Sequence, residues 1–150
     1  ARQRLIPLLG SPTARIALIH VHDVARALAA QLQMPPSGCI QGLADDSPQG
    51  YSWREILTAA ATAVGNNRPR FVQMHPWLLQ GIGQTAGVAA RLMGQAAMFN
   101  PGKLRELLHE DWSAPADTLL KSTASKPQYT LLEGFRTTAE WYRQARWLHA

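Results

Sequence analysis

Apolar and polar positions along the chain divide it into short segments that alternate between strand-like and helix-like patterns. Residues 16–21 form a β-prone run, and apolar residues then recur at helical spacing over residues 24–33. Asp23 stands between the two, and its carboxylate can accept a hydrogen bond from a backbone N–H of a helix's first turn. The pattern therefore predicts a strand, a cap at Asp23 and a helix over residues 24–33.

The middle of the chain contains a predicted buried strand and a helix with clear end signals. Residues 39–44, "CIQGLA", are expected to form a short buried strand that places Cys39 in the core. Ser52 and Glu55 have the spacing of a capping box, and Gly65 stands just past the end of an apolar face. These signals predict a helix between Ser52 and Gly65.

A long apolar run follows a predicted strand at residues 70–74, which Pro76 ends. From residue 77 to residue 99 the only charge is that of Arg91. The run approaches transmembrane length, but its glutamines, its arginine and its four glycines make it a poor span. We expect a buried or interface helix, interrupted near residues 81–87.

Two more helices are expected near the end of the chain. Asn100, followed by a proline, is expected to cap the first of them. Thr130 and Glu133 form a second possible capping box after a polar loop, and the helix that follows has an apolar face of Leu132, Phe135, Ala139 and Tyr142. Trp141 and Trp147 add aromatic area, which predicts that this last helix docks on another element.

Composition indicates one domain that is incomplete alone. With 150 residues, 46% of them hydrophobic, the chain is long enough for one core. Only 17% of the residues are charged, below the roughly 25% typical of soluble domains, which indicates an apolar surface that needs a partner. The chain opens without Met and shows no signal peptide, so we expect a fragment or a processed product.

The charges and the cysteine count exclude several classes of function. The formal net charge is +5, with 12 Arg and 3 Lys, but these residues are scattered and the only tight group is Arg68 and Arg70. We therefore expect no nucleic-acid binding. Cys39 is the single cysteine, so it can form neither an internal disulfide nor a Cys-rich zinc site. This predicts a reducing compartment, and we expect a cytoplasmic protein with no membrane partner.

The stretch "IHVHDV" places two histidines and an acid together in the manner of a metal site. His20 and His22 would share one face of a strand. A metal needs further ligands, and the remaining histidines, at positions 75, 109 and 149, lack ligand spacing. Because Asp23 is already assigned as a helix cap, we expect no metal site.

Two other patterns imitate the motifs of cofactor enzymes. Residues 81–86, "GIGQTA", match a dinucleotide-binding fingerprint, but they lie inside a helical stripe and lack an acidic residue about 20 positions on. Tyr142 and Arg146 have the spacing of a Tyr-x-x-x-Lys pair, but arginine stays protonated and cannot tune the tyrosine in the same way. We therefore expect no catalytic residues and no cofactor bound by this chain alone.

Four stretches, in order, resemble a known family. They are "ALIHVHDVARAL", "GCIQGLADDSPQGYSWREILTAAATAVG", "NPGKLRELLHEDW" and "LLEGFRTTAEWYRQARWL". From about residue 5 to residue 148 the chain resembles the C-terminal half of an NAD(P)-dependent epimerase/dehydratase, of the extended or atypical short-chain dehydrogenase/reductase branch. The Gly-rich loop and the Tyr-x-x-x-Lys pair of that family belong to an N-terminal part that is not present in these residues.

The resemblance implies an α/β fragment, mainly helical with a few short strands, that forms the C-terminal lobe of a Rossmann-type protein. Residues 1–150 would be one domain, a substrate-binding lobe with edge elements of a cofactor domain whose N-terminal part is absent. The parent protein would use NAD or NADP on a sugar nucleotide or another small molecule, as an epimerase, dehydratase or reductase. The missing N-terminal cofactor domain is then the main expected partner.

Three residues are candidates for binding the substrate. Arg15, His75 and Lys103 stand near predicted strand ends or helix starts, where cationic or hydrogen-bonding groups suit a polar or anionic substrate. Some sugar-nucleotide members of the family have an Arg four residues before the position of His20, whereas Arg15 stands five before it, so this chain departs from their pattern. The family often has an acid at the position of His22, which argues further against a metal.

A second class of function stays open. The apolar run over residues 77–99 suits a stand-alone helical interaction module that forms a homodimer or docks on another protein.

Overall fold

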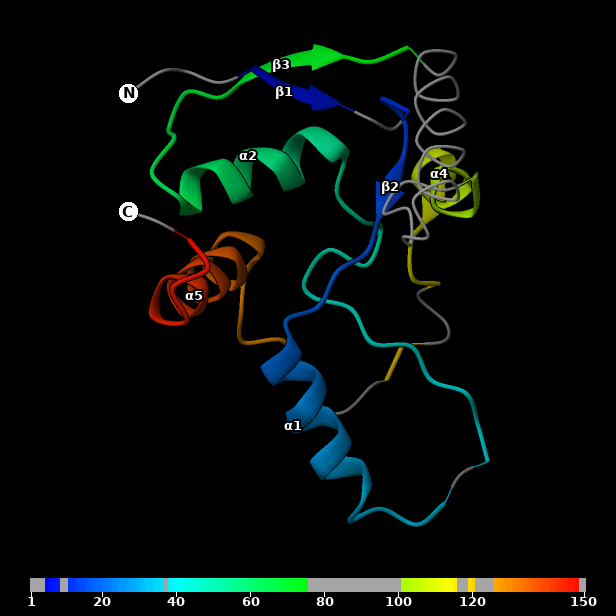
Figure 1. Ribbon diagram of the computed structural model, residues 1–150. Helices are drawn as coiled ribbons and strands as arrows, with labels where there is room; N and C mark the ends of the chain where they lie inside the picture. Colours follow the sequence, from blue (N-terminus) through cyan, green and yellow to red (C-terminus); the bar gives the residue numbers. More distant parts are fainter. Residues whose placement is uncertain are drawn as a thin grey trace, which may run out of the picture.

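The computed structural model describes residues 5–8, 11–36, 38–75, 101–115, 119–120 and 126–148. Their elements follow one another along the chain as β1 (Leu5–Leu8), β2 (Arg15–Ile16), α1 (Val21–Gln31), α2 (Trp53–Ala63), β3 (Arg70–Gln73), α4 (Pro101–Leu108), β4 (Asp111–Trp112) and α5 (Leu131–Gln144) (Figure 1). The described residues are thus mixed helix and strand, with more helix than strand.

The described strands form two separate parallel pairs. β1 pairs with β3 in a register that runs from Leu5 opposite Arg70 to Leu8 opposite Gln73, and β2 pairs with β4. The strand at residues 70–74 is therefore confirmed as β3, while its partner β1 was not predicted. Parallel pairing requires a long crossover, and here α2 lies within the crossover from β1 to β3.

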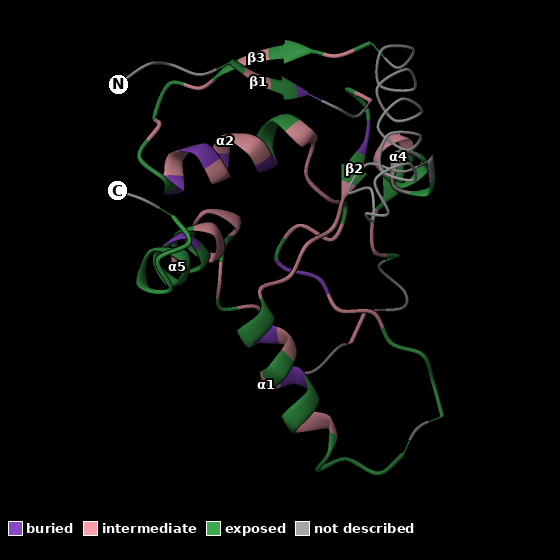
Figure 2. Ribbon diagram, in the orientation of Figure 1, coloured by how far each residue is buried: buried purple, intermediate pink, exposed green. Residues whose placement is uncertain are grey.

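The main packing contact joins two helices. α2 packs on α5 and on β1, so it lies between the β1–β3 pair and α5 (Figure 1). The buried residues of the two helices are mostly alanines: Ile56, Ala59, Ala61, Ala63 and Ala139. Figure 2 shows buried positions on both helices. Small side chains allow the helix axes to approach closely, so this contact buries little surface for each residue.

Both predicted capping boxes are present. The Ser52 hydroxyl accepts from the Glu55 backbone N–H at 3.3 Å, and the Glu55 carboxylate accepts from the Ser52 N–H at 2.7 Å. Thr130 and Glu133 make the same exchange at the start of α5. The helix predicted after Asn100 is also found, as α4, although Asn100 itself lies outside the described residues.

The predicted boundary between the first strand and the first helix is wrong. The strand covers only Arg15–Ile16, and α1 begins at Val21 with His20 as its N-cap. The His20 Nδ1 accepts the His22 backbone N–H at 3.3 Å, so Asp23 is not the cap. The carboxylate of Asp23 accepts hydrogen bonds from a distant segment instead of from the helix's own first turn.

The predicted buried strand over residues 39–44 is also wrong. Cys39 is exposed, Ile40 is 96% exposed, and the backbone makes one isolated bridge, from Gly42 to Leu119. An apolar run is buried as a strand only where it can pair with a neighbouring strand. Among the described residues no strand lies along this segment.

Several expectations fall on residues 76–100, which lie outside the described residues: the apolar run at 77–99 and the Gly-rich stretch at 81–86. Within the part of the chain that the structure describes, no helix is both long enough and apolar enough to cross a membrane.

The buried carboxylate of Asp23 ties α1 to the start of α5. Asp23 is 1% exposed and accepts the backbone N–H groups of Gln128 at 3.1 Å and Tyr129 at 3.2 Å. Arg26 donates to the same carboxylate at 2.7 Å and to the Lys126 carbonyl. One side chain thus satisfies two backbone donors of the segment that leads into α5.

A Schellman motif ends α5 and folds the last residues back over it. The N–H of Trp147 donates to the Tyr142 carbonyl at 2.9 Å and the N–H of Arg146 to the Arg143 carbonyl at 3.0 Å. Arg146 has φ +59°, the left-handed conformation that this position usually gives to glycine. The Trp147 ring then packs against the Tyr142 ring, with centroids 5.6 Å apart.

We predict that Asp23→Ala lowers the free energy of unfolding by about 3 kcal/mol, because it leaves Arg26 and the backbone N–H groups of Gln128 and Tyr129 without their acceptor. Urea denaturation measures the change. Asp46→Ala is the matched control, since Asp46 is exposed and its removal should alter stability by less than about 0.5 kcal/mol. Equal effects of the two variants would contradict the role given to Asp23.

We predict that Arg146→Gly raises the free energy of unfolding by about 1 kcal/mol, because glycine adopts the left-handed conformation without the clash of a Cβ atom. Arg146→Ala removes the same charge but keeps the Cβ, so it should not stabilise the chain. Thermal unfolding of the two variants separates backbone strain from charge; a gain in Arg146→Ala as large as in Arg146→Gly would assign the effect to charge.

Candidate functional site

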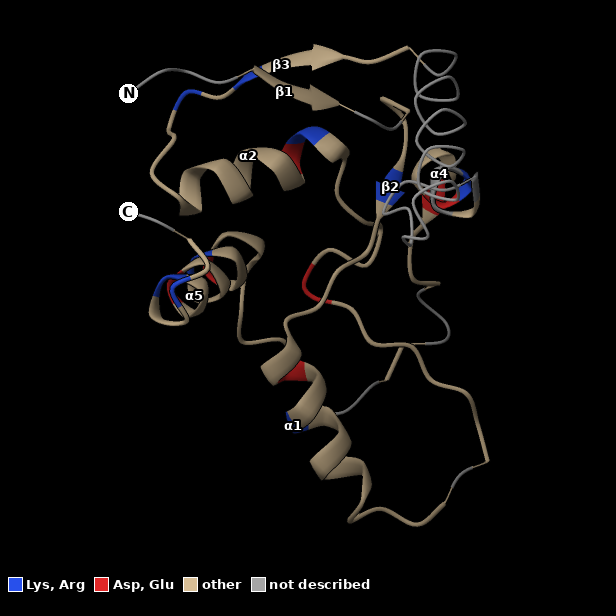
Figure 3. Cartoon of the chain, in the orientation of Figure 1, with Lys and Arg blue, Asp and Glu red and all other residues tan. Residues whose placement is uncertain are grey.

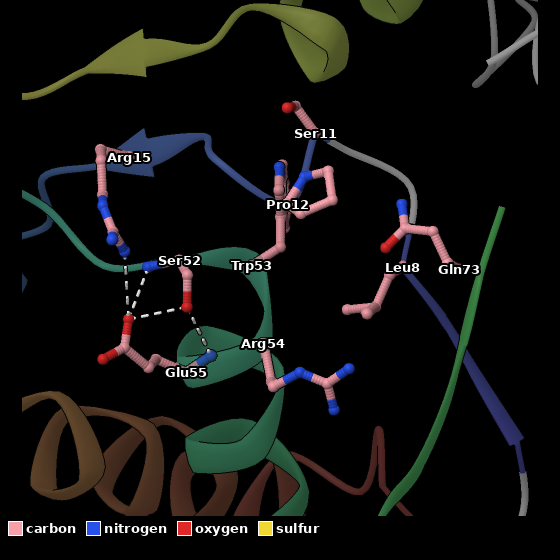
Figure 4. A pocket seen from close by; sticks show the side chains of 9 residues that line it. All are labelled: Leu8, Ser11, Pro12, Arg15, Ser52, Trp53, Arg54, Glu55 and Gln73. Carbon is pink, nitrogen blue, oxygen red and sulfur yellow. Dashed lines mark hydrogen bonds and ion pairs between the residues drawn. The ribbon is translucent and has the colours of Figure 1, made fainter. Parts of the chain in front are cut away.

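A polar cavity of about 440 Å³ opens beside the first turn of α2. The segment after β1 forms one wall, the end of β3 another, and the start of α2 the floor (Figure 4). Its lining residues are Leu8, Ser11, Pro12, Arg15, Ser52, Trp53, Arg54, Glu55 and Gln73. Two arginines and a glutamate give this cavity charged groups of both signs.

Arg15 lies near the carboxylate of Glu55, which already accepts hydrogen bonds from Ser52 at the N-cap of α2. Its Nη1 lies 3.7 Å from Glu55 Oε2, and both side chains are more than half exposed. Hydrogen bonds from the side chain and backbone of Ser52, with the charge of Arg15 as a smaller cause, hold the pKa of Glu55 below its ordinary value. Glu55 therefore stays ionised in this cavity, and Arg15 can turn to another acceptor at little cost.

Arg54 and Trp53 add donors that the sequence patterns did not indicate. The Arg54 guanidinium lies over the Phe71 ring, 5.0 Å from its centroid, which supports its position beside the cavity. The indole Nε1 of Trp53 is buried and has no hydrogen-bond partner in the described part of the chain. A buried donor without an acceptor is costly, and a ligand oxygen or a water could accept from it. Together these groups suit a polar or anionic ligand atom.

The three predicted substrate-binding residues do not gather at this cavity. Arg15 lines it, whereas His75 follows the end of β3, is exposed and is not among the lining residues. Lys103 belongs to α4, and its side chain lies outside the described residues. Only Arg15 is thus placed at the candidate site, and the roles of His75 and Lys103 stay predictions.

A smaller and more apolar cavity, of about 240 Å³, lies where α1 and α5 begin. The His20 ring stacks on the Tyr129 ring with centroids 4.1 Å apart, and a Cβ added at Gly134 would lie 3.2 Å from His20 Cδ2. The His22 Nδ1 lies 3.3 Å from the Tyr129 hydroxyl oxygen. Both histidines therefore contact Tyr129, and their own rings lie edge to face with centroids 4.9 Å apart.

Within the described residues, no three His, Cys, Asp or Glu side chains come together as a metal site. Burial lowers the pKa of the His20 imidazole below its ordinary value, His22 lowers it further, and Asp23 opposes both. A neutral imidazole can accept the His22 N–H at Nδ1, so the lowered pKa and the capping role are consistent.

Asp45 and Tyr51 form a second, partly buried polar contact, which fixes a loop. The Tyr51 hydroxyl donates to Asp45 at 2.8 Å, and the Ser47 N–H donates to the same carboxylate at 2.9 Å. Burial, with Asp45 adding to it, raises the pKa of Tyr51 to about 12. Gly50 is required in this loop, because a Cβ there would lie 2.6 Å from the backbone nitrogen of Ile16.

Nearly the whole chain is similar to a known protein that is named as a reductase. The match is thus to an oxidoreductase. The chain is similar to the ceramide reductase of Caulobacter vibrioides (strain NA1000 / CB15N), with 36% identity over 148 residues, which is 99% of this chain. The chain spans 45% of the length of that protein.

No family model matches the chain. No solved structure matches it either.

We predict that protonation of His20 destabilises the fold. The pKa of His20 is lower in the folded state than in the unfolded state. Its contribution to the free energy of unfolding is therefore complete above the unfolded pKa of about 6.5, and it is lost as the pH falls through the pKa of the folded state. His20→Asn keeps an acceptor at the N-cap but cannot titrate, so its stability should fall less steeply with pH than that of the unchanged chain.

Urea denaturation between neutral and mildly acidic pH measures this difference. His75→Asn is the control, since it removes an exposed histidine outside both cavities. The same pH slope in His20→Asn as in the unchanged chain would show that His20 does not carry the effect.

Proposed function

We propose that this chain is the substrate-binding portion of a reductase of the short-chain dehydrogenase/reductase type, whose nicotinamide cofactor is held by residues outside this chain. The reductase is proposed to act on a lipid of ceramide type. The observation that carries the proposal is the 36% identity over 148 residues to a ceramide reductase, with similarity throughout the chain.

An exposed apolar stripe on α1 supports the view that further protein covers this portion. Val21, Leu28 and Leu32 recur on one face of α1 and are 68%, 57% and 88% exposed. Ile40, in the segment predicted to be a strand, is 96% exposed. Large apolar side chains in such a row are typical of an interface. We assign this stripe to contact with the missing cofactor domain.

The proposal places the dinucleotide site outside the described residues. Their two parallel strand pairs have no Gly-rich loop between a strand and a helix, and the Gly-rich stretch at 81–86 lies outside them. The role proposed for this chain is therefore to hold the substrate, with NAD or NADP bound by the remainder of the protein.

The polar cavity is the proposed place for the polar end of the substrate. Arg15, Arg54 and the Trp53 indole could each donate a hydrogen bond to an amide or hydroxyl oxygen. Arg15 and Glu55 are exposed enough for a ligand to separate them. A sugar nucleotide would use the same donors, but the relative's activity favours a lipid.

A second candidate is an interaction module that works without a cofactor domain. The α1 stripe would then contact a second copy of the chain or another protein.

We predict that a chimera, in which this chain replaces the matching residues of the Caulobacter reductase, reduces the carbonyl precursor of a ceramide with NADPH or NADH. Loss of nicotinamide absorbance and lipid chromatography measure the reaction. The isolated chain should show no turnover. Arg15→Ala in the chimera should raise KM roughly tenfold through loss of a charge-assisted hydrogen bond, whereas Arg105→Ala, on exposed α4, should leave KM unchanged.

If the chimera is inactive, a second experiment tests whether this chain copurifies with the remaining part of the Caulobacter protein, expressed as a separate polypeptide. Val21→Asp with Leu28→Asp should abolish that association. Failure of both experiments would overturn the proposal, and association of the chain only with itself would favour the interaction module.

A further inference from the structure

An aromatic surface stands at the C-terminal end of α5. It consists of Trp141, Tyr142, Trp147 and Leu148, which are 54%, 36%, 68% and 38% exposed. The Trp147 ring lies 5.5 Å from the Trp141 ring and 5.6 Å from the Tyr142 ring, so the three rings form one cluster. The C-terminal end of α5 lies at one edge of the molecule, away from α1 (Figure 1), and the ribbon there is coloured as exposed (Figure 2).

The backbone holds the aromatic surface in a defined shape. Trp147 and Leu148 both donate their N–H groups to the Tyr142 carbonyl, at 2.9 and 3.2 Å. The turn that makes this possible places Arg146 at φ +59°, which is unfavourable for a residue with a Cβ atom. Without this turn, Trp147 would not return to the helix. The exposed rings are therefore an ordered feature and not the loose end of a chain.

Positive charge borders the aromatic surface. Arg146 stands next to Trp147 in the sequence and is exposed, whereas the Arg143 guanidinium donates to the Ala63 carbonyl of α2 at 3.3 Å. Figure 3 shows basic residues on α5. Of the two acidic residues of α5, Glu133 is held in the capping box at the opposite end, and Glu140 lines an open cavity with Arg136 and Arg143. The chain as a whole carries a formal net charge of +5. The surroundings of the rings thus complement an anionic surface.

The size of the aromatic surface argues against a protein partner of its own. A fully exposed large aromatic side chain offers at most about 250 Å², and these four side chains are only 36% to 68% exposed. Their combined area stays below the roughly 800 Å² that each partner contributes to a stable interface. A bilayer interface needs no such area, because a few Trp and Tyr rings lie at headgroup level while nearby Arg side chains reach the phosphates.

We propose that the C-terminal aromatic surface docks on a lipid bilayer that contains anionic phospholipid. Trp141 and Trp147 enter the interfacial region, and Arg146 contacts the headgroups. This replaces the expectation of no membrane partner, and it does not depend on the proposed reductase function.

Vesicle flotation tests the proposal with the full 150-residue chain. The probes are vesicles of phosphatidylcholine alone and of phosphatidylcholine mixed with phosphatidylglycerol. The chain should float with the mixed vesicles, and added salt should weaken the binding. Trp141→Ala with Trp147→Ala should abolish flotation. Trp112→Ala is the matched control, because Trp112 is 48% exposed but lies on β4, and it should bind like the unchanged chain.

Two further measurements make each outcome decisive. Arg146→Gly removes one charge and preserves the turn, so it should weaken binding to mixed vesicles several-fold while circular dichroism stays unchanged. Sedimentation without vesicles reports whether the double Trp variant loses self-association. The proposal is overturned if the unchanged chain floats with neither vesicle, if the double Trp variant floats as well as the control, or if the rings hold two copies together.

Discussion

The described fold depends on one buried carboxylate. α1 contacts the C-terminal part of the chain through Asp23, which accepts two backbone N–H groups and the Arg26 guanidinium while almost no solvent reaches it. A carboxylate in that position is acceptable only because each of its interactions is with a donor. This constraint places Thr130 at the start of α5, and α5 in turn packs on α2. The segment that leads into the last helix is therefore positioned by a side chain 105 residues earlier.

The same chain of contacts positions the polar cavity. α2 is held between α5 and β1, so its first turn projects toward the segment that follows β1. The capping box there has two effects, because Glu55 satisfies the first backbone N–H of the helix and also faces Arg15. Since the cap keeps Glu55 ionised and in place, the electrostatic character of the cavity is a consequence of how the helix begins.

The sequence predicted those features whose physical cause is local. Both capping boxes need only residues three positions apart, and a proline after Asn100 indicates where a helix starts. The role of Asp23 could not be predicted in this way, since its partners at residues 128 and 129 are distant in the chain. Nor could the exposure of residues 39–41, because the pattern shows that a segment is apolar but not whether a sheet is there to pair with it. At the candidate site, Arg15 was predicted, whereas Arg54 and Trp53 lie at the cavity only because of the position of α2.

The Arg15–Glu55 ion pair is weak, and this weakness leaves Arg15 available to bind a ligand. A strong buried pair would have to be broken before a ligand could use the arginine, but these groups are 3.7 Å apart and more than half exposed. Glu55 does not depend on Arg15, because Ser52 supplies its two closest hydrogen bonds. When Arg15 turns to a ligand, the helix start keeps its cap and the carboxylate keeps its donors. A cation that can leave its partner without disturbing the fold is therefore available for recognition, and the same capping box serves both the stability of α2 and the chemistry of the cavity.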